Sequence, residues 1–467
     1  MVLHDEIYGG VLIMKLNFIT GSLAILSILI GCAVWGGCGA PFGIGSAGNS
    51  GIDTVGASDP LVMQTTDPTL IPVLKYPNST DTGVSLMPVL QWNAVTGASN
   101  YHVFMSGNSD FIVNTLIVDN LTNNNFDTVS SVLPYGSSYF WVVCAIGAIG
   151  QEAWSPVGHF TTQSLLPLQN AYVAQKFGMF IHFNMSTFAR YNYPSPGGEW
   201  ELGNENEDLF NPASLNCGQW ADVAKSAHCK YVVLTAKHHG GFCLWPSKGP
   251  WSIKPHSIAQ SVWYQQNGNR DILKEFVDSV RSRGMEPGFY YSVRDETNPP
   301  TLPMVLGQLT ELLTNYGDIK VIWFDGWGWY VGYLQIPYAP VANLVHELNA
   351  KLGHHTIISE NNHQKSLFNT EIVQYEIPID GPPLAGNTLP SEGNEPIRLD
   401  NCWFWHPMSS ASKSTSFILN RISSANAVNT TYLLDLTPDT TGLIPDYQVQ
   451  AMSDIGTTGI QQGVIQP

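Results

Sequence analysis

The chain has 467 residues, of which 44% are apolar and only 12% are charged, and its 37 acidic and 20 basic residues give a net charge of −17. This length excludes a single small domain, and the acidic balance excludes a general nucleic-acid binder, because phosphate contacts need clustered Lys and Arg. The 14 Trp and 19 Tyr provide many aromatic rings on which sugar faces could stack, so the composition favours a carbohydrate partner.

Residues 1–31 are predicted to be a signal region. We expect translation to start at Met14 rather than at Met1. Met14-Lys15 is a short basic start, and the uncharged run 16–31 is too short for a comfortable transmembrane helix. The sequence Leu-Ile-Gly-Cys at 29–32 resembles the bacterial lipobox, so we expect cleavage before Cys32 and acylation of that residue. An ordinary cleaved signal is the alternative. The prediction is a protein secreted to the bacterial cell envelope, on the periplasmic or the outer side, which contacts the membrane by its lipid anchor only.

A flexible linker at 32–65 and a small all-β module at 66–165 are expected next. Residues 39–58 are rich in Gly, Ser and Ala, which cannot bury a core. The segment 66–163 contains short alternating runs separated by turn residues, a pattern typical of a β-sandwich. It resembles a fibronectin type III module, with Trp92 at the early core position and 133–139 similar to the tyrosine-corner stretch. Such a module predicts a spacer rather than chemistry, with sugar binding as the alternative.

From residue 166 to the end, continuous apolar runs alternate with helical periodicity. This alternation predicts a parallel sheet covered by helices on both faces, and the length suits a (β/α)8 barrel of the TIM type, with a doubly wound open sheet as the runner-up. Glycine-rich phosphate-binding motifs do not follow any of the runs. The expected strands are 178–183, 231–236, 287–292, 319–326, 355–359, 371–377 and 431–438. The expected helices are 217–228, 270–284, 302–317, 339–353, 412–427 and 447–456.

Polar side chains follow several of these runs, at the strand ends where barrels carry their active sites. His182 ends the first run, His238 and His239 follow the second, and Asp325 ends the fourth. Histidine and carboxylate groups suit a metal, but none of these residues has the helical spacing of a zincin, and adjacent strand residues point to opposite faces. A polar pocket for hydroxyl groups, without a metal or another cofactor, is therefore favoured.

At these residues the chain resembles the α-L-fucosidases of glycoside hydrolase family 29. The resemblance covers 171–457, and its most specific parts are AKHH with GFCLWPS (236–247) and WFDG (323–326), supported by EWELG (199–203) and WFWHP (403–407). It implies a (β/α)8 barrel, a retaining double displacement and no metal cofactor.

The resemblance also implies roles for individual residues. Asp325 of WFDG would be the nucleophile that forms a glycosyl-enzyme ester, and Tyr290 would point at the sugar near it, with Tyr291 as the alternative. The remaining expected sugar contacts are His182, Glu199, Trp200, His238, His239, Trp323 and Trp405.

The general acid/base is expected at Glu392, in what reads as a loop between the sixth and seventh strands. Pro390-Ser391-Glu392 precedes WFWHP, as in family members that share that ending, and Glu376 and Glu395 are the alternatives. One departure concerns the histidine pair. The family's usual His-His-Asp-Gly reads His-His-Gly-Gly at 238–241, so a carboxylate is missing.

The sequence therefore predicts a retaining exo-glycosidase that removes terminal α-L-fucose, or a closely related α-L-sugar, from an oligosaccharide or glycoconjugate. The alternative is a catalytically inactive carbohydrate-binding surface lipoprotein, for which the missing carboxylate and the appended module are the motives.

Overall fold

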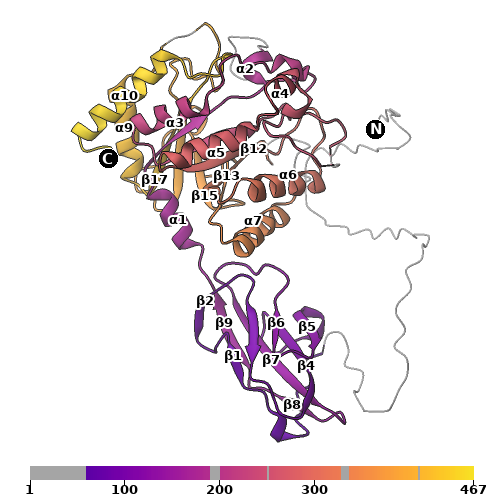
Figure 1. The fold of residues 1–467 in the computed structure, drawn as a ribbon. Helices are drawn as coiled ribbons and strands as arrows, with labels where there is room; N and C mark the ends of the chain where they lie inside the picture. Colours follow the sequence, from indigo (N-terminus) through magenta and orange to yellow (C-terminus); the bar gives the residue numbers. More distant parts are fainter. Residues whose placement is uncertain (1–58, 190–199, 250–251, 328–335, 409–410) are drawn as a thin grey trace, which may run out of the picture. The chain divides into compact units, whose positions relative to one another are not determined.

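The computed structural model describes residues 59–189, 200–249, 252–327, 336–408 and 411–467 (Figure 1). The predicted signal region, Cys32 and most of the predicted linker lie outside these residues. Within the described ranges, we find no helix whose length and apolar character would let it cross a bilayer.

An all-β region precedes the barrel, as predicted. Three antiparallel strands form one sheet, in the order β1 (Leu74–Tyr76), β3 (Val89–Trp92) and β6 (Phe126–Thr128). A second sheet has the order β2 (Asp81–Val84), β9 (Gly158–Thr162), β7 (Ser138–Gly147), β4 (Ala98–Ser106) and β5 (Leu116–Thr122), with β8 (Glu152–Trp154) paired to β7. The short helical turns η1 (Pro68–Leu70) and η2 (Val113–Thr115) lie among these strands. Alternate strand residues, among them Trp92 and Trp141, are fully buried in one core.

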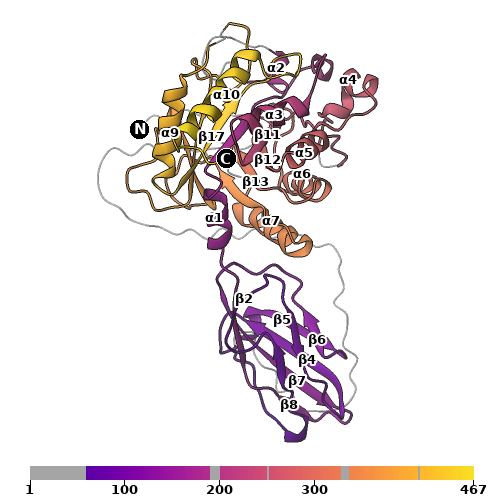
Figure 2. The same ribbon diagram turned by 60° about the vertical axis from the view of Figure 1, so that its left-hand side comes forward.

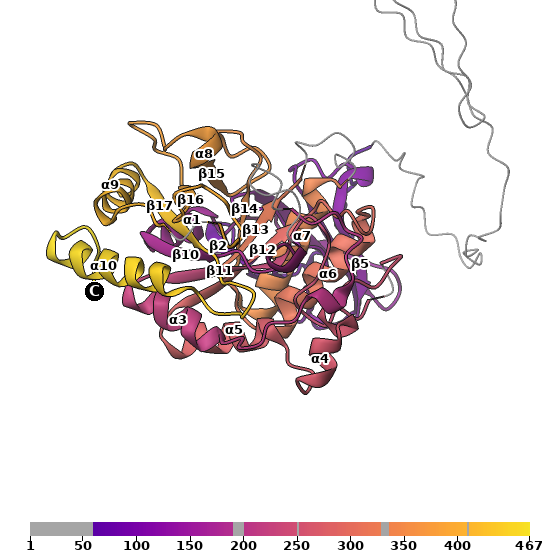
Figure 3. The ribbon, with the colours of Figure 1, turned by 90° about the horizontal axis from the view of Figure 1, so that it is seen from above.

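Eight parallel strands then close into a barrel, which confirms the predicted fold class. Neighbouring strands pair in sequence order, and the last strand pairs with the first. Figure 3 shows the strands at the centre with the helices around them. The strands are β10 (Phe177–Ile181), β11 (Tyr231–Lys237), β12 (Glu286–Ser292), β13 (Val321–Asp325), β14 (Ile357–Glu360), β15 (Ile372–Glu376), β16 (Ser391–Pro396) and β17 (Thr430–Leu436).

Amphipathic helices cover the outside of the barrel (Figure 2). In α5, for example, Asp271 caps the first turn, and Ile272, Phe276 and Val280 are buried on one face, which matches the predicted stripe. The longer helices are α3 (Cys217–Ser226), α5 (Ile272–Ser282), α6 (Leu302–Asn315), α7 (Tyr338–Leu352), α9 (Thr415–Asn426) and α10 (Asp446–Gln461). Shorter helical turns are α2 (Ser186–Ala189), η3 (Glu207–Leu209), η4 (Ile258–Gln260), α4 (Val262–Gln266) and α8 (Ile377–Asp380).

One strand was not expected from the sequence. The segment Ser-Glu-Gly-Asn-Glu-Pro of β16 reads as a loop in the sequence, but it forms a strand whose six residues are all buried between β15 and β17. It lacks the apolar or alternating pattern by which strands are recognised, because most of its side chains are polar although they are buried inside the barrel or under the helices. This difference decides the position of Glu392.

Helix α1 (Leu166–Val173) closes the amino-terminal end of the barrel. Tyr172 is fully buried among inward-facing barrel residues, including Tyr231 at the start of β11. Gln169 donates a hydrogen bond from Nε2 to the carbonyl oxygen of Glu371, just before β15, at 2.8 Å. The barrel is therefore filled at this end, and open space is found near the carboxyl ends of the strands.

Candidate active site

A pocket of about 350 Å³ lies at the carboxyl ends of the barrel strands. Residues from β10, β12, β13, β15 and β16 line it together with residues from the connecting loops. The lining residues are Phe180, His182, Trp200, His238, His239, Tyr290, Trp323, Asp325, Asn361, His363, Glu376, Ile379, Asn394 and Trp403.

Most of the predicted site residues come together in this pocket. His182, Trp200, His238, His239, Tyr290, Trp323 and Asp325 all line it. Tyr290 is the inward-facing member of its pair, because the hydroxyl of Tyr291 instead donates to Gln308 Oε1 of α6 at 2.6 Å. Trp403, rather than the predicted Trp405, belongs to the lining, and Glu199 lies outside the described residues.

Asp325, the last residue of β13, faces the pocket with a side chain that is 14% exposed. Its Oδ2 accepts a hydrogen bond from the Tyr290 hydroxyl at 2.8 Å, and its Oδ1 accepts one from the Gly326 N–H at 2.7 Å. Burial and the charge of Asp325 raise the pKa of Tyr290 well above its usual value, so the phenol remains a donor. The carboxylate is therefore held in one orientation while it remains accessible.

His239 is a neutral imidazole whose tautomer follows from its neighbours. The Ser292 hydroxyl donates to the Arg294 carbonyl oxygen at 2.8 Å, so it accepts a hydrogen bond from His239 Nδ1 at 2.7 Å. Burial and the nearby His238 lower the pKa of His239 well below its usual value. Nε2 therefore carries a lone pair into the pocket, 3.7 Å from Asp325 Oδ2, where it can accept a hydrogen bond from a hydroxyl group.

His182 is paired with a buried carboxyl group of the last barrel strand. Its Nδ1 lies 2.7 Å from Asp435 Oδ1, and burial lowers the pKa of His182 and raises that of Asp435, each well away from its usual value. Burial thus disfavours charge on both partners. The pair fixes the ring of His182 against the side of the pocket.

Aromatic rings form the floor of the pocket. Tyr290 and Trp323 are stacked with ring centroids 5.4 Å apart, and Phe180 meets Trp323 edge-on at 5.2 Å. Below this floor, Trp323 Nε1 donates to Glu392 Oε1 at 2.8 Å. Trp323 therefore separates the pocket from Glu392.

The structure does not place Glu392 where a general acid/base would have to be. Glu392 is fully buried in the barrel, is absent from the pocket lining and accepts three hydrogen bonds besides that of Trp323. The donors are Tyr172 at 2.5 Å, Tyr231 at 2.6 Å and Gln374 at 3.1 Å. Because β16 is a strand, Glu392 points inward two residues before the pocket-lining Asn394. The geometry thus contradicts the expectation for Glu392, which instead supports Trp323 from below.

Of the two alternatives, Glu376 lines the pocket and Glu395 does not. Glu395 faces the helices, where it pairs with Lys413 at 2.9 Å and Arg421 at 3.1 Å. Glu376 ends β15, and its Oε2 accepts a hydrogen bond from Asn361 Nδ2 at 2.8 Å. Burial and the charge of Asp325 raise the pKa of Glu376 to about 7. The pocket therefore contains two carboxyl groups, and one of them holds a proton near neutral pH.

Asp380 organises the rim beside Glu376. Its Oδ2 accepts a hydrogen bond from the Glu376 N–H at 3.0 Å and lies 3.1 Å from His363 Nδ1. This contact raises the pKa of His363. The α8 turn, through Asp380, thus fixes both Glu376 and the His363 imidazole.

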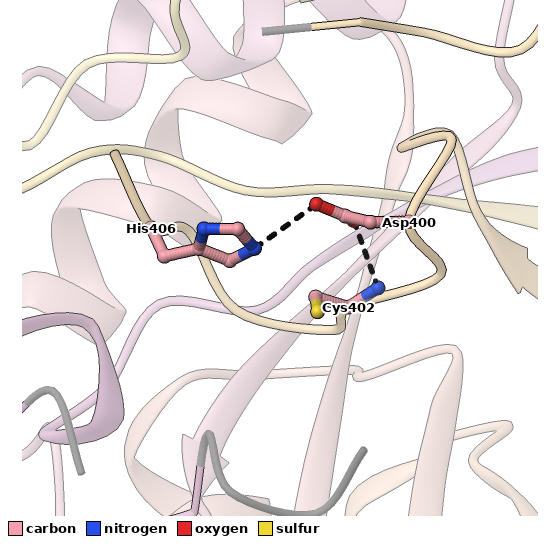
Figure 4. Close-up of side chains that lie close together, drawn as sticks. All are labelled: Asp400, Cys402 and His406. Atoms are coloured by element: carbon pink, nitrogen blue, oxygen red, sulfur yellow. Dashed lines mark hydrogen bonds and ion pairs between the residues drawn. The ribbon is translucent and has the colours of Figure 1, made fainter. Parts of the chain in front are cut away.

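The loop after β16, which carries Trp403, is fastened by Asp400 (Figure 4). Arg398 donates to both Asp400 oxygens, at 3.1 and 2.7 Å, and His406 Nε2 lies 3.0 Å from Oδ2. Partial burial raises the pKa of Asp400, but Arg398 and the Cys402 N–H outweigh it and lower that pKa to about 2. The possible ligand atoms of three residues here lie within 4.8 Å of one another, as in a metal site: Asp400, Cys402 and His406. The Arg398 guanidinium, however, already balances the charge of the Asp400 carboxylate. The cluster instead holds the loop that brings Trp403 to the pocket.

The sequence prediction missed several lining residues. Phe180 and Trp403 belong to motifs that were recognised, and strand alternation would have assigned Phe180 to the face of His182. Asn394 could not be found, since its strand was not recognised. The others are His363 in a loop, Ile379 in the short helical turn α8, and Asn361, which immediately follows β14.

Comparisons with known proteins agree with this architecture. The model of the family Alpha-L-fucosidase matches residues 188–458. Alpha-L-fucosidase 1 of Arabidopsis thaliana is 30% identical over 320 residues, which are 62% of this chain and 60% of the plant protein.

Solved structures give the same picture. A glycoside hydrolase 29 family member from an unknown rumen bacterium is 27% identical with a TM-score of 0.50, over 62% of this chain and 56% of that one. A Bacteroides thetaiotaomicron protein classed as an alpha-L-fucosidase is 25% identical with a TM-score of 0.52, over 63% and 67% of the two chains. The chain thus spans less than two thirds of the plant relative. The family model covers more than half of the chain, including the barrel strands from β11 to β17. The chain belongs to the alpha-L-fucosidase family.

Proposed function

We propose that the protein is a retaining exo-acting α-L-fucosidase that acts on a fucosylated oligosaccharide or glycoconjugate. The observation that carries this proposal is the pair of carboxyl groups in one pocket, Asp325 held by two donors and Glu376 with a pKa raised to about 7. Two carboxyl groups in different environments are the arrangement by which glycosidases assign a nucleophile and an acid. The proposal that the sugar is α-L-fucose rests on membership of the alpha-L-fucosidase family.

In the first step the Asp325 carboxylate attacks the anomeric carbon. The glycosidic C–O bond breaks as Glu376 donates its proton to the leaving oxygen, which departs as an alcohol. In the second step Glu376, now a carboxylate, takes a proton from a water molecule. The resulting hydroxide attacks the anomeric carbon, the ester to Asp325 breaks, and the sugar leaves with its configuration retained.

The remaining lining residues suit a single terminal sugar. His239 Nε2, Asn361 and Asn394 offer hydrogen-bonding groups for hydroxyls, while Trp323 and Trp403 offer apolar faces. A 6-deoxy sugar needs both, because its methyl group requires an apolar contact. Since Trp323 closes the floor, the sugar chain can extend only away from it, which is the geometry of exo action.

The test is to replace each carboxyl group and to follow the products formed with azide. Asp325→Ala should reduce turnover of an aryl α-L-fucoside by at least about 10⁴-fold, since the covalent route is lost. Azide should rescue this variant by attacking from the vacated side, which gives a fucosyl azide of inverted configuration.

Glu376→Ala should lose about 10²–10⁴-fold with a poor leaving group and much less with a dinitrophenyl fucoside. Azide should here react with the covalent intermediate and give the azide of retained configuration. Unchanged turnover in Asp325→Ala, or identical azide products from both variants, would contradict the proposal.

The alternative of an inactive sugar-binding protein is not favoured by any specific observation. Its motive is the missing carboxylate of the His-His-Gly-Gly segment, yet Asp325 and Glu376 both line the pocket.

We further propose that the N-terminal β region is a fibronectin type III-like spacer and that Cys32 carries a lipid anchor in the bacterial cell envelope. The first proposal is supported by the two-sheet arrangement with Trp92 in its core. The second rests on the sequence alone, and metabolic labelling with a radioactive fatty acid, compared between the parent and Cys32→Ser, would test it.

A further inference from the structure

Another buried glutamate, Glu201, lies directly behind the pocket, next to His238. Glu201 follows the pocket-lining Trp200, and its side chain is fully buried. Its Oε2 lies 3.2 Å from His238 Nδ1 and accepts a hydrogen bond from the Ser186 hydroxyl, and its Oε1 accepts one from the Gly240 N–H at 3.0 Å. Asp325 and Glu376 do the proposed bond-breaking, so the mechanism leaves Glu201 without a role.

The charge state of Glu201 determines the tautomer of His238. Burial raises the pKa of Glu201, but His238 and the Gly240 N–H outweigh this and lower it. An ionised carboxylate only accepts hydrogen bonds, so the proton of the shared bond belongs to His238 Nδ1. The other ring nitrogen, Nε2, then presents a lone pair when the imidazole is neutral.

Gly240 is the position where the resembled family pattern, His-His-Asp-Gly, has its aspartate. A Cβ atom at Gly240 would lie 1.7 Å from Cγ of Glu201, so no side chain fits there while Glu201 is in place. The backbone of Gly240 does not demand glycine, whereas the following Gly241 has a φ of +90°. Gly240 thus lacks a side chain because Glu201 occupies its space.

We infer that Glu201 is a positioning residue that holds His238 as the Nδ1–H tautomer, with Nε2 facing the sugar as a hydrogen-bond acceptor, and that it supplies from 39 residues earlier the carboxylate that residue 240 lacks. The inference rests on the proposed function only for the contact between His238 and the sugar. The arrangement of Glu201, Gly240 and His238 can be tested without turnover.

The first experiment exchanges the two positions. Glu201→Ala should lower kcat/KM for an aryl α-L-fucoside by about 10–100-fold, by analogy with carboxylate partners of metal-bound imidazoles. Gly240→Asp alone should lower both activity and Tm, because its side chain collides with Glu201. The double variant Glu201→Ala with Gly240→Asp should recover kcat/KM to within about threefold of the parent and should exceed both single variants.

A matched control is Glu205→Gln, because Glu205 is equally buried and lies in the same segment. It accepts hydrogen bonds from the Leu202 and Gly203 N–H groups, at 2.6 and 2.8 Å, and within the described part of the chain its hydrogen-bond partners are these backbone groups rather than the imidazoles. It should lower Tm while leaving KM unchanged. If KM rose equally in Glu205→Gln and Glu201→Ala, the effect of Glu201 would be explained by fold stability alone. That result would overturn the inference.

The second experiment observes the tautomer directly in the intact protein. Long-range ¹H–¹⁵N spectra, with the His238 signal assigned by His238→Gln, should show Nδ1 protonated in the parent, and Glu201→Ala should shift the population toward Nε2–H. A parent spectrum with the proton on Nε2 overturns the inference even if the double variant cannot fold. If the protein releases no fucose at all, this spectrum still decides the role of Glu201, so the two proposals fail separately.

Discussion

Asp325 and Glu376 carry the proposed chemistry because their surroundings differ, although each is the last residue of a barrel strand, β13 or β15. Asp325 is oriented by a phenol and a backbone N–H, and its negative charge acts on Glu376 through the pocket. Glu376 has one amide donor, from Asn361, and is otherwise buried. The group with the poorer support for charge therefore retains the proton.

This difference predicts a pH profile that separates Glu376 from Glu392. The acid must be protonated in the first step, so kcat/KM for a poor leaving group should fall as the pH rises through about 7. The fall should disappear in Glu376→Gln assayed with a dinitrophenyl fucoside. Glu392→Gln should keep the fall and lose stability instead, because it disturbs four buried hydrogen bonds. An unchanged profile in Glu376→Gln would transfer the acid role to another group.

At the scale of single elements, buried polar contacts fix the loops that extend β11 and β12 toward the pocket. Lys237, the last residue of β11, donates to Asp295 Oδ2 at 3.0 Å, and both side chains are almost completely buried. Asp295 also accepts hydrogen bonds from the N–H groups of Thr297 and Asn298. Since His238 and His239 follow Lys237 directly, the ion pair holds the segment that carries them.

Lys237→Met should destabilise the protein by about 3–5 kcal/mol, because it leaves the Asp295 charge buried without its partner. Chemical denaturation would measure the change in the free energy of unfolding. Lys274→Met is the control, since it breaks an exposed pair with Asp278 on α5 and should cost at most about 0.5 kcal/mol. Equal effects of the two substitutions would show that the buried pair has no special role.

At the scale of the whole molecule, the β region and the barrel have separate hydrophobic cores. One core contains Val103 and Trp141, another contains Val232 and its neighbours, and no residue belongs to both. All residues that line the pocket belong to the barrel. The chemistry is therefore expected to depend on the barrel alone.

Val103→Ala should lower the unfolding transition of the β region by about 4–8 °C for each kcal/mol lost, and should leave kcat/KM unchanged. Val232→Ala in β11 should lower the unfolding temperature of the barrel, which calorimetry should show as a separate transition. A single transition that shifts equally in both variants would contradict the independence of the two cores.

The sequence alone predicts those features that leave a periodic or positional pattern in it. The apolar runs and helical stripes predicted seven of the barrel strands and the outer helices, because burial on one face imposes a periodic pattern. His182, His238, His239 and Asp325 were predicted to lie in one site because they follow or end predicted strands, and parallel strands finish at the same edge.

Which carboxyl groups lie in the pocket was decided by the tertiary structure alone. The polar β16 carries no strand signal, so Glu392 was expected in a loop but lies under Trp323. Glu376 rather than Glu392 faces Asp325 because strand register determines which residue of a strand points into the pocket. Glu201 reaches His238 across 37 residues of chain, a proximity created only by the closed barrel.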